Sequence, residues 1–239
     1  MNVPIENQRQ LIKESNIMRK NIIDLENEKT NYKEVLKELN QNHKKLNNIM
    51  EGIAEIITEV IEIKDPNFIG HQKKVSKLAT AIAEEIKLSQ DKIEGIKFAA
   101  LVCDLGKVNL PAEITNKSSK LSEEEYICIK NHPKVSYDIF TKVDFPWPIA
   151  EIVFQHHERL DGSGYPRGLK GDKILLEAKI IAIADVVVAM SSNRLYRPAY
   201  SIKEALEEIT KNKGILYESK IVDSCLKLFN EKNFKFSEK

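Results

Sequence analysis

Four histidines and two aspartates follow one another along this chain in an order that suits a buried divalent-metal site. They are His71, Asp104, His132, the doublet His156-His157, and Asp185. Imidazole nitrogens and carboxylate oxygens are common ligands of divalent metals in proteins. The set therefore indicates metal chemistry rather than binding alone.

The two aspartates interrupt apolar runs. Asp104 follows residues 99–103, Ala-Ala-Leu-Val-Cys, and Asp185 lies between residues 180–184, Ile-Ile-Ala-Ile-Ala, and residues 186–188, Val-Val-Val. A carboxylate in such a run is expected to be buried, and a buried charge without a partner costs on the order of several kcal/mol. Each aspartate therefore needs a cation. An ion pair with Lys or Arg is the structural alternative, but two such aspartates together with four histidines favour a metal.

The histidine doublet His156-His157 is separate support for a metal site. Its expected helix has an apolar stripe made of Ile149, Ile152, Val153, His156 and Leu160. Neighbours on a helix point about 100° apart, so His156 should face inward and His157 should lie at the edge of the stripe. Taken alone, His156 would be interpreted as a hydrogen-bonded core histidine.

Composition limits the classes of function. The chain has 239 residues, a formal net charge of +1 and 42% hydrophobic residues, which allows one substantial domain plus an extension. Near-zero charge gives no support for a partner that is a nucleic-acid polymer or a membrane surface. Apolar runs are too short for a membrane span, and the N-terminus has no secretory pattern. Three scattered cysteines without a CxxC motif favour a reducing compartment, so we expect a cytoplasmic protein.

A heptad pattern dominates the N-terminal quarter. One row places an apolar residue at every seventh position: Leu11, Met18, Leu25, Tyr32, Leu39, Leu46, Ile53 and Val60. A second row completes the a/d seam: Ile22, Lys29, Leu36, His43, Met50 and Ile57. The pattern predicts a long helix that pairs with a second copy as a parallel coiled coil. A helix folded back on its own globular domain is the alternative.

The rest of the chain predicts an all-α domain. Amphipathic spacing appears between Val75 and Ile86 and again between Ile93 and Val102. Capping-box patterns start at Ser122 and Ser201, and Pro148 suits the start of the doublet's helix. We therefore expect a dimerisation helix over residues 1–61 and a helical domain over residues 62–239.

Several segments of this domain resemble the HD-GYP family, whose members belong to the HD hydrolase superfamily. The matching segments are Gly70-His71, Asp104-Leu-Gly-Lys107, Asn131-His-Pro133, His156-His-Glu-Arg159, Asp161 to Leu169, Ile183-Ala-Asp185 and Asn193 to Arg197. The resemblance covers about residues 65 to 225 in unbroken order. It implies an all-α HD-type domain and a metal-dependent phosphodiesterase of bacterial signalling that hydrolyses cyclic di-GMP or a related cyclic dinucleotide.

The resemblance also implies roles for individual residues. The implied metal ligands are His71, Asp104, His132, His156, His157 and Asp185, with Asp104 bridging two ions. Asp104 and Lys107 are the implied catalytic residues, Lys107 contacting a phosphate or the metal-bound water. The implied substrate-binding residues are Gly164, Tyr165, Pro166, Arg194 and Arg197. Two divalent ions, iron or manganese, are the implied cofactors, and they activate the attacking water.

One departure from the family pattern affects the chemistry. Cys103 precedes Asp104 where the family has histidine. A thiolate at Cys103 is one possible ligand; the other interpretation is that Cys103 is a bystander and one metal site is weakened. The leading hypothesis is a phosphodiesterase. The alternative is a catalytically degenerate module that binds a cyclic dinucleotide or a protein without turnover. A third hypothesis is a nucleotide phosphohydrolase of the wider superfamily.

Overall fold

The computed structural model describes residues 5–64, 69–115, 117, 119–193 and 198–236. Across these ranges the chain forms helices and no strand, apart from an isolated bridge between Lys213 and Tyr217. The predicted all-α class is therefore confirmed. Packing divides the chain into two compact units, Met1–Met50 and Glu51–Lys239.

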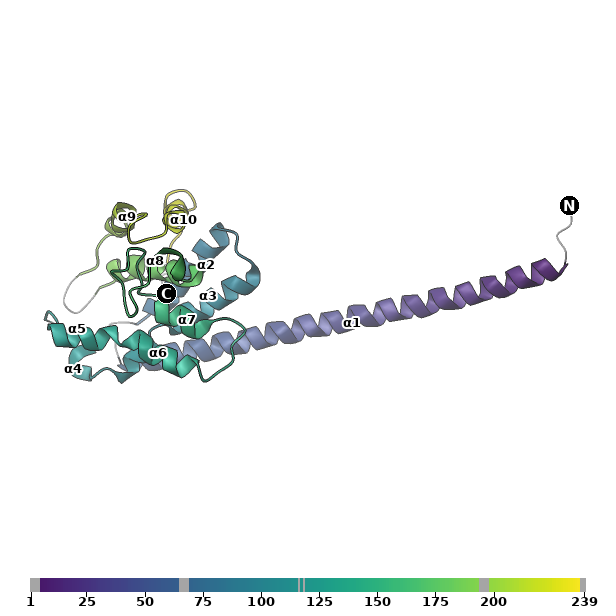
Figure 1. Ribbon diagram of the computed structural model, residues 1–239, viewed down its shortest axis with the longest axis horizontal. Helices are drawn as coiled ribbons and strands as arrows, with labels where there is room; N and C mark the ends of the chain where they lie inside the picture. The colour runs from purple at the N-terminus through teal and green to yellow at the C-terminus, as the bar shows by residue number, and fades with distance from the viewer. Residues whose placement is uncertain (1–4, 65–68, 116, 118, 194–197, 237–239) are drawn as a thin grey trace. The chain divides into compact units, whose positions relative to one another are not determined.

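The predicted long helix exists as one uninterrupted element, α1, which covers Ile5–Lys64 (Figure 1). In a single chain the first heptad row is exposed; for example, the side chains of Leu25 and Leu39 are 63% and 62% exposed. Large apolar side chains repeated along an exposed helix are typical of a surface that binds a partner.

The last turns of α1 belong to the second unit. Ala54, Thr58 and Ile61 are buried, and the Thr58 hydroxyl donates a hydrogen bond of 2.9 Å to the Leu101 carbonyl. The compact unit therefore begins before the expected boundary at residue 62. The separate roles expected for residues 1–61 and 62–239 remain predictions.

Short helices make up the rest of the second unit. They are α2 (His71–Glu85), α3 (Gln90–Val102), η2 (Leu105–Asn109), α4 (Ala112–Thr115), α5 (Glu123–Lys130), α6 (His132–Phe140), α7 (Ile149–Gln155), η3 (Gly171–Lys173), α8 (Leu176–Met190), α9 (Ile202–Lys211) and α10 (Ser219–Asn230). None of the helices in the described ranges combines the length and apolar character that crossing a bilayer requires.

Local signals in the sequence set several helix starts. The side chains of Ser122 and Ser201 each accept a hydrogen bond from the backbone amide three residues later, in Glu125 and Glu204. The side chain of each glutamate in turn accepts a hydrogen bond from the backbone amide of the serine, so both predicted capping boxes form. Pro148 is the N-cap of α7, directly before the helix that leads to the histidine doublet. The helix boundaries near the site thus follow from short-range chemistry.

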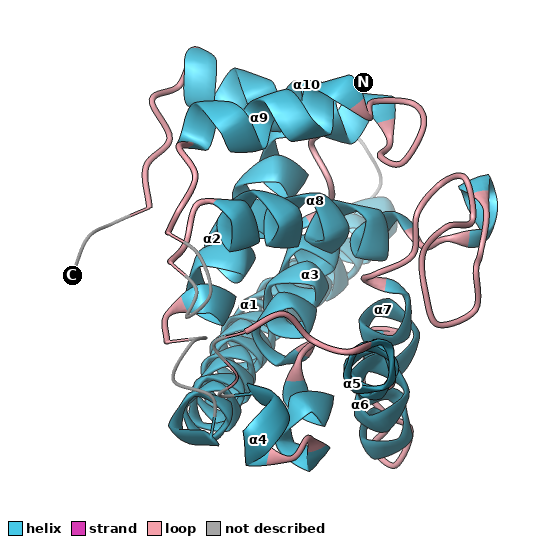
Figure 2. Ribbon diagram, turned by 90° about the vertical axis from the view of Figure 1, so that its left-hand side faces the viewer, coloured by secondary structure: helices cyan, strands magenta, loops and turns pink. Residues whose placement is uncertain are grey.

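Helix α8 is the central element of the second unit. Its sequence is apolar on nearly all sides, and it contacts α2, α3, α7, α9 and α10. A helix that is apolar all round is expected in the interior of a domain. Figure 2 shows α9 and α10 side by side on one side of α8, and α6 next to α7. The metal-ligating candidates lie where α2, α3, α6, α7 and α8 approach one another.

Candidate metal centre

Each candidate ligand lies at a helix end or on the central helix. His71 is the first residue of α2, Asp104 follows α3, and His132 is the first residue of α6. The doublet His156-His157 follows the last turn of α7, and Asp185 lies on α8. Residues more than a hundred positions apart in the sequence therefore meet in one place.

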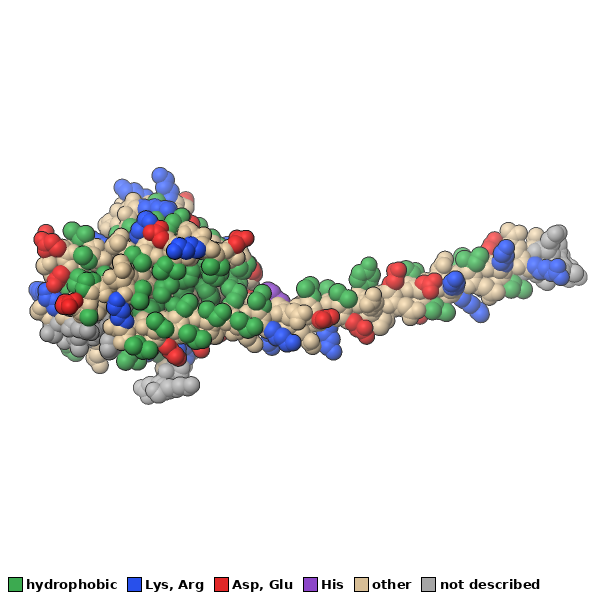
Figure 3. All heavy atoms as spheres, turned by 90° about the horizontal axis from the view of Figure 1, so that it is seen from below, with side chains coloured by type: hydrophobic (Ala, Val, Ile, Leu, Met, Phe, Trp, Pro, Cys, Tyr) green, Lys and Arg blue, Asp and Glu red, His purple; other side chains and the backbone are tan. Residues whose placement is uncertain are grey.

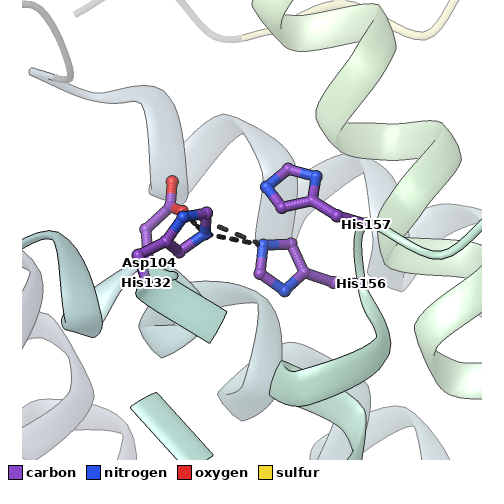
Figure 4. Close-up of side chains that lie close together, drawn as sticks. All are labelled: Asp104, His132, His156 and His157. Atoms are coloured by element: carbon purple, nitrogen blue, oxygen red, sulfur yellow. Dashed lines mark hydrogen bonds and ion pairs between the residues drawn. The ribbon is translucent and has the colours of Figure 1, made fainter. Parts of the chain in front are cut away.

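Four of these residues form a tight cluster. Asp104, His132, His156 and His157 each offer one ligand atom, and these atoms all lie within 4.8 Å of one another. Figure 4 shows Asp104 and His132 facing His156 and His157 across a common centre. Asp104 Oδ1 lies 3.0 Å from His132 Nε2 and 3.8 Å from His156 Nε2, and the two Nε2 atoms are 3.4 Å apart.

Backbone carbonyls fix the tautomers of two of the imidazoles. His132 Nδ1 lies 2.7 Å from the Ile129 carbonyl, and His156 Nδ1 lies 2.6 Å from the Val153 carbonyl. A carbonyl oxygen only accepts, so each Nδ1 carries the proton and donates it. Burial, opposed in part by Asp104, lowers the pKa of His132, which keeps that ring neutral at pH 7. In the neutral form of each ring, the lone pair of Nε2 therefore points to the centre.

This arrangement leaves three electron-pair donors facing each other without a proton among them. Asp104 Oδ1 is buried and accepts no hydrogen bond, while the two Nε2 atoms carry lone pairs. Such a buried convergence is unfavourable unless a cation occupies it. A divalent metal suits the donor set, and the Nδ1–carbonyl bonds are the outer contacts that orient metal-binding histidines.

His71 and Asp185 form the other part of the site. His71 Nε2 lies 2.9 Å from Asp185 Oδ1, and His157 Nδ1 lies 3.9 Å from Asp185 Oδ2. Burial disfavours the charged carboxylate of Asp185, but its contacts with His71 and His157 hold its pKa well below the usual range. His157 thus links this pair to the four-residue cluster.

Asp104 is ionised. Burial opposes its charge, but the nearby Lys107 ammonium holds its pKa well below the usual range. Lys107 Nζ donates to Asp104 Oδ2 at 2.8 Å, and the amide of Gln72 donates to the same oxygen at 2.6 Å. Lys107 therefore lies at the edge of the cluster, and its contact with a phosphate remains a prediction.

Cys103 lies beside the cluster and is not one of its four residues. Its Sγ is 3.6 Å from Gln72 Oε1 and 3.6 Å from the Ala100 carbonyl. Burial and the charges of Asp104 and Asp185 raise the pKa of the Cys103 thiol well above its ordinary value. The thiol is therefore protonated and acts as a donor to Gln72.

Gly106 allows α6 to approach the cluster. A Cβ atom at Gly106 would lie 2.0 Å from the His132 carbonyl oxygen, so any other residue would displace that backbone. The Gly106 amide donates to Ser136 Oγ at 2.8 Å, and Ser136 donates to the Cys103 carbonyl at 3.0 Å. These contacts fix the start of α6 against the end of α3.

The Gly-Tyr-Pro loop packs directly on the doublet. A Cβ atom at Gly164 would lie within 2.5 Å of backbone atoms of residues 157–159, so glycine is required there. The Tyr165 ring lies 4.7 Å from the His157 ring, and burial raises the pKa of Tyr165 above its ordinary value. Pro166 follows through a cis peptide bond. The loop therefore forms one wall next to His157.

Glu158 organises this loop, and sequence reasoning missed it. Its side chain is buried, and its two oxygens accept the backbone amides of Arg167 at 2.8 Å and Leu169 at 2.9 Å. Gln72 was missed in the same way. Each follows a predicted ligand directly in the sequence, which is the one signal that could have found them. Two other candidates, Arg194 and Arg197, lie outside the described residues.

Comparisons with known proteins agree with this geometry. A family model described as the HD domain matches residues 55–221. The cyclic di-GMP phosphodiesterase response regulator RpfG of Xanthomonas campestris is 35% identical over 187 residues, covering 76% of this chain and 50% of that protein. A cyclic di-GMP phosphodiesterase of Thermotoga maritima is 38% identical, covering 75% of this chain and 49% of that protein. The 3'3'-cGAMP-specific phosphodiesterase 1 of Vibrio cholerae is 40% identical over 65% of this chain and 36% of that protein.

Solved structures show the same fold. Bd1817, an HDG"Y"P protein of Bdellovibrio bacteriovorus, matches with a TM-score of 0.59 at 18% identity, covering 77% of this chain and 62% of that one. A cyclic GMP-AMP-specific phosphodiesterase of V. cholerae also gives a TM-score of 0.59, at 20% identity, covering 77% of this chain and 49% of that one. The chain spans about half the length of the first two curated relatives.

Proposed function

Because the chain belongs to the HD domain family, as its HD-GYP resemblance predicted, we propose that it is a metal-dependent phosphodiesterase. Its proposed substrate is cyclic di-GMP or a related cyclic dinucleotide, in bacterial second-messenger signalling. Two of the relatives above are named as cyclic di-GMP phosphodiesterases, and the third is named as a 3'3'-cGAMP-specific phosphodiesterase. The observation that carries the proposal is the buried meeting of Asp104 Oδ1 with the lone pairs of His132 and His156.

The metal ligands we propose are the four cluster residues together with His71 and Asp185. When bound, divalent ions supply an activated water for attack on phosphorus and stabilise the leaving oxygen. Iron or manganese suits the mixed imidazole and carboxylate donors. The expected pair of ions remains a prediction.

The remaining residues are proposed to handle the substrate. Lys107 Nζ lies against Asp104 at the edge of the cluster, where an ammonium can attract a phosphate oxygen. The loop of Gly164, Tyr165 and Pro166 offers an aromatic face beside His157 for a nucleobase. Arg194 and Arg197 stay in the proposal on their sequence match alone.

A homodimer through α1 is the proposed assembly, and the cytoplasm is the proposed location. The exposed first heptad row supports the dimer, and the free cysteines Cys103, Cys128 and Cys225 suit a reducing compartment. Figure 3 shows apolar side chains spaced along α1.

The test is turnover of cyclic di-GMP and cyclic GMP-AMP by anaerobically purified protein supplied in turn with Fe²⁺, Mn²⁺ and Zn²⁺. We expect hydrolysis with at least one metal, and we expect the near-isosteric Asp104→Asn to lower the rate by about 10³-fold or more, because it removes the anion that the imidazoles surround. Asp138→Asn is the matched control, since Asp138 pairs with Lys134 on the exposed side of α6. Folded, metal-loaded protein without turnover would contradict the proposal.

One observation favours the alternative of a module that binds without turnover. The Cys103 thiol donates to Gln72 and supplies no ligand to the cluster. If that loss inactivates the site, the protein will bind a cyclic dinucleotide without cleaving it, and Cys103→His will gain activity. Turnover by the unmodified chain would exclude this alternative.

A further inference from the structure

The two oxygens of Asp104 have different surroundings. Oδ2 accepts hydrogen bonds from Gln72 Nε2 at 2.6 Å and from Lys107 Nζ at 2.8 Å. A carboxylate oxygen offers two lone pairs, so these two donors occupy Oδ2. Oδ1 accepts no hydrogen bond and faces His132 and His156. Asp104 therefore presents one free oxygen to a cation.

The chemistry of its neighbours fixes the orientation of the Gln72 amide. The ionised Asp104 only accepts, so the amide atom next to it is the nitrogen. The amide oxygen then faces Cys103, whose thiol lies 3.6 Å away and donates to it. Gln72 and Cys103 are each 1% exposed, so water does not compete for these contacts. The thiol, the amide and Oδ2 form a continuous relay.

This relay ends on Asp104, whose charge acts on Asp185 in the other part of the site. On one side, Asp104 Oδ1 and the imidazoles of His132, His156 and His157 supply four donors to one ion. On the other side, the His71–Asp185 pair supplies fewer donors and would need Asp104 Oδ2 to complete its set. Oδ2 becomes available only if Gln72 or Lys107 releases it.

Resting on the proposed metal-dependent function, we infer that the two parts of the site bind divalent ions with unequal affinity and that Gln72 sets the difference. The cluster of Asp104, His132, His156 and His157 holds the first ion. A second ion at His71 and Asp185 binds at least about tenfold more weakly, the scale on which outer contacts of metal ligands act. Gln72 is a positioning residue, and Cys103 fixes its amide.

The test is a Mn²⁺ titration of the metal-free 239-residue chain, with free Mn²⁺ read from its electron paramagnetic resonance signal and bound metal from elemental analysis. The unmodified chain is expected to bind two ions in separate stages. Gln72→Leu keeps the side-chain size but removes the amide donor, while Lys107 still holds Asp104. We expect this variant to lower the dissociation constant of the second Mn²⁺ ion by about 10-fold or more. The difference between the first and second dissociation constants should therefore become smaller.

Ser76→Ala is the matched control. Ser76 lies one turn further along α2, is buried, and donates to the Lys97 carbonyl at 3.0 Å, away from the cluster. This variant should keep the two stages unchanged. Cys103→Ala, which removes the thiol that orients Gln72, is a second variant should Gln72→Leu not fold, and it should narrow the gap in the same direction.

Equal dissociation constants for the two Mn²⁺ ions in the unmodified chain would overturn the inference. An unchanged difference between the two constants in a folded Gln72→Leu or Cys103→Ala variant would also overturn it. Unequal binding without hydrolysis of either cyclic dinucleotide would leave the inference standing and contradict the proposed activity. Hydrolysis by a chain whose two sites bind Mn²⁺ with equal affinity would support the proposed activity and overturn the inference. Failure to bind any Mn²⁺ would overturn both.

Discussion

At the scale of single residues, the site depends on which atoms are already satisfied. Asp104 uses Oδ2 for Gln72 and Lys107, and this leaves Oδ1 for a cation. The tautomers of His132 and His156 follow from carbonyls three residues earlier in the chain. The orientation of each ligand is therefore decided by its hydrogen bonds outside the cluster.

Glycine matters as much as the ligands at this scale. We predict that Gly106→Ala lowers both stability and metal affinity, because its Cβ would lie 2.0 Å from the His132 carbonyl oxygen and force the start of α6 away. The expected loss is about 1–3 kcal/mol in the free energy of unfolding, measured by urea denaturation. Mn²⁺ affinity should fall by about 10-fold or more.

Gly52→Ala is the control for this substitution. Gly52 lies within α1, and a Cβ atom there meets nothing within 4 Å. Alanine should stabilise the helix by about 0.5–1 kcal/mol and leave metal affinity unchanged. If Gly106→Ala, like Gly52→Ala, lowered neither the free energy of unfolding nor the Mn²⁺ affinity, the close approach of α6 to Gly106 would not determine the position of His132.

At the scale of elements, charged contacts join the end of α2 to α10 and the segment after it. Glu85 lies 2.7 Å from Lys227 Nζ and also pairs with Lys232. Hydrogen bonds from Lys227 and Lys232 lower the pKa of Glu85 from 4.5 to about 2. Because α2 begins with His71, this contact helps to fix the helix that carries a candidate ligand.

The pH dependence of this contact has a definite sign. The pKa of Glu85 is lower in the folded state than in the unfolded state, so its contribution is complete above about pH 4.5 and is lost as the pH falls towards about 2. We predict that Glu85→Gln lowers the melting temperature at pH 7 by about 1–2 °C, as exposed ion pairs are modest. The difference from the unmodified chain should shrink between pH 5 and pH 3 in thermal melts.

The control is Glu207→Gln, because Glu207 pairs with Lys203 within α9 and joins no second helix among the described residues. Its effect should be smaller at every pH. If the difference in melting temperature between Glu85→Gln and the unmodified chain increased as the pH fell, the Lys227 and Lys232 contacts would not be stabilising the folded chain.

The exposed stripe of α1 changes along its last turns. Ile53, Ile56, Val60 and Ile63 are exposed with spacings of three, four and three residues, while Ile57 from the second heptad row is half-buried. The globular unit covers one side of these turns, so the apolar side left open combines the first row with neighbours of the second.

At the scale of the whole molecule, the prediction concerns assembly. Leu39→Glu combined with Leu46→Glu should convert the proposed dimer to a monomer, because two carboxylates from each chain would be buried in the seam. Light scattering of the full chain would show the mass fall by half. In the control, Gln41→Glu with Asn48→Glu adds the same charge to exposed positions off the first row.

A dimer that survives Leu39→Glu and Leu46→Glu would contradict assembly through this row and place the interface elsewhere. A control pair that also dissociated would show that charge, rather than the seam, was responsible. Loss of the dimer with unchanged helix content by circular dichroism would support the coiled coil.

The sequence by itself determined the all-helical class, the long helix and the capped starts of α5 and α9. These features depend on periodicity and on contacts within four residues, which a sequence displays directly. The family could also be predicted from the sequence, because its motifs keep their order and spacing along the chain. The candidate ligands could be named for the same reason.

Only the tertiary structure decided how those candidates are used. Asp104, His132, His156 and His157 meet in one cluster, and His71 pairs with Asp185 across 114 positions of sequence. The roles of Gln72 and Glu158 were not visible, because an amide or a carboxylate beside a ligand has no pattern until its partners are placed. The direction of the Cys103 thiol, towards Gln72, is likewise set by the packing of α2 on α3, a long-range contact that local spacing does not encode.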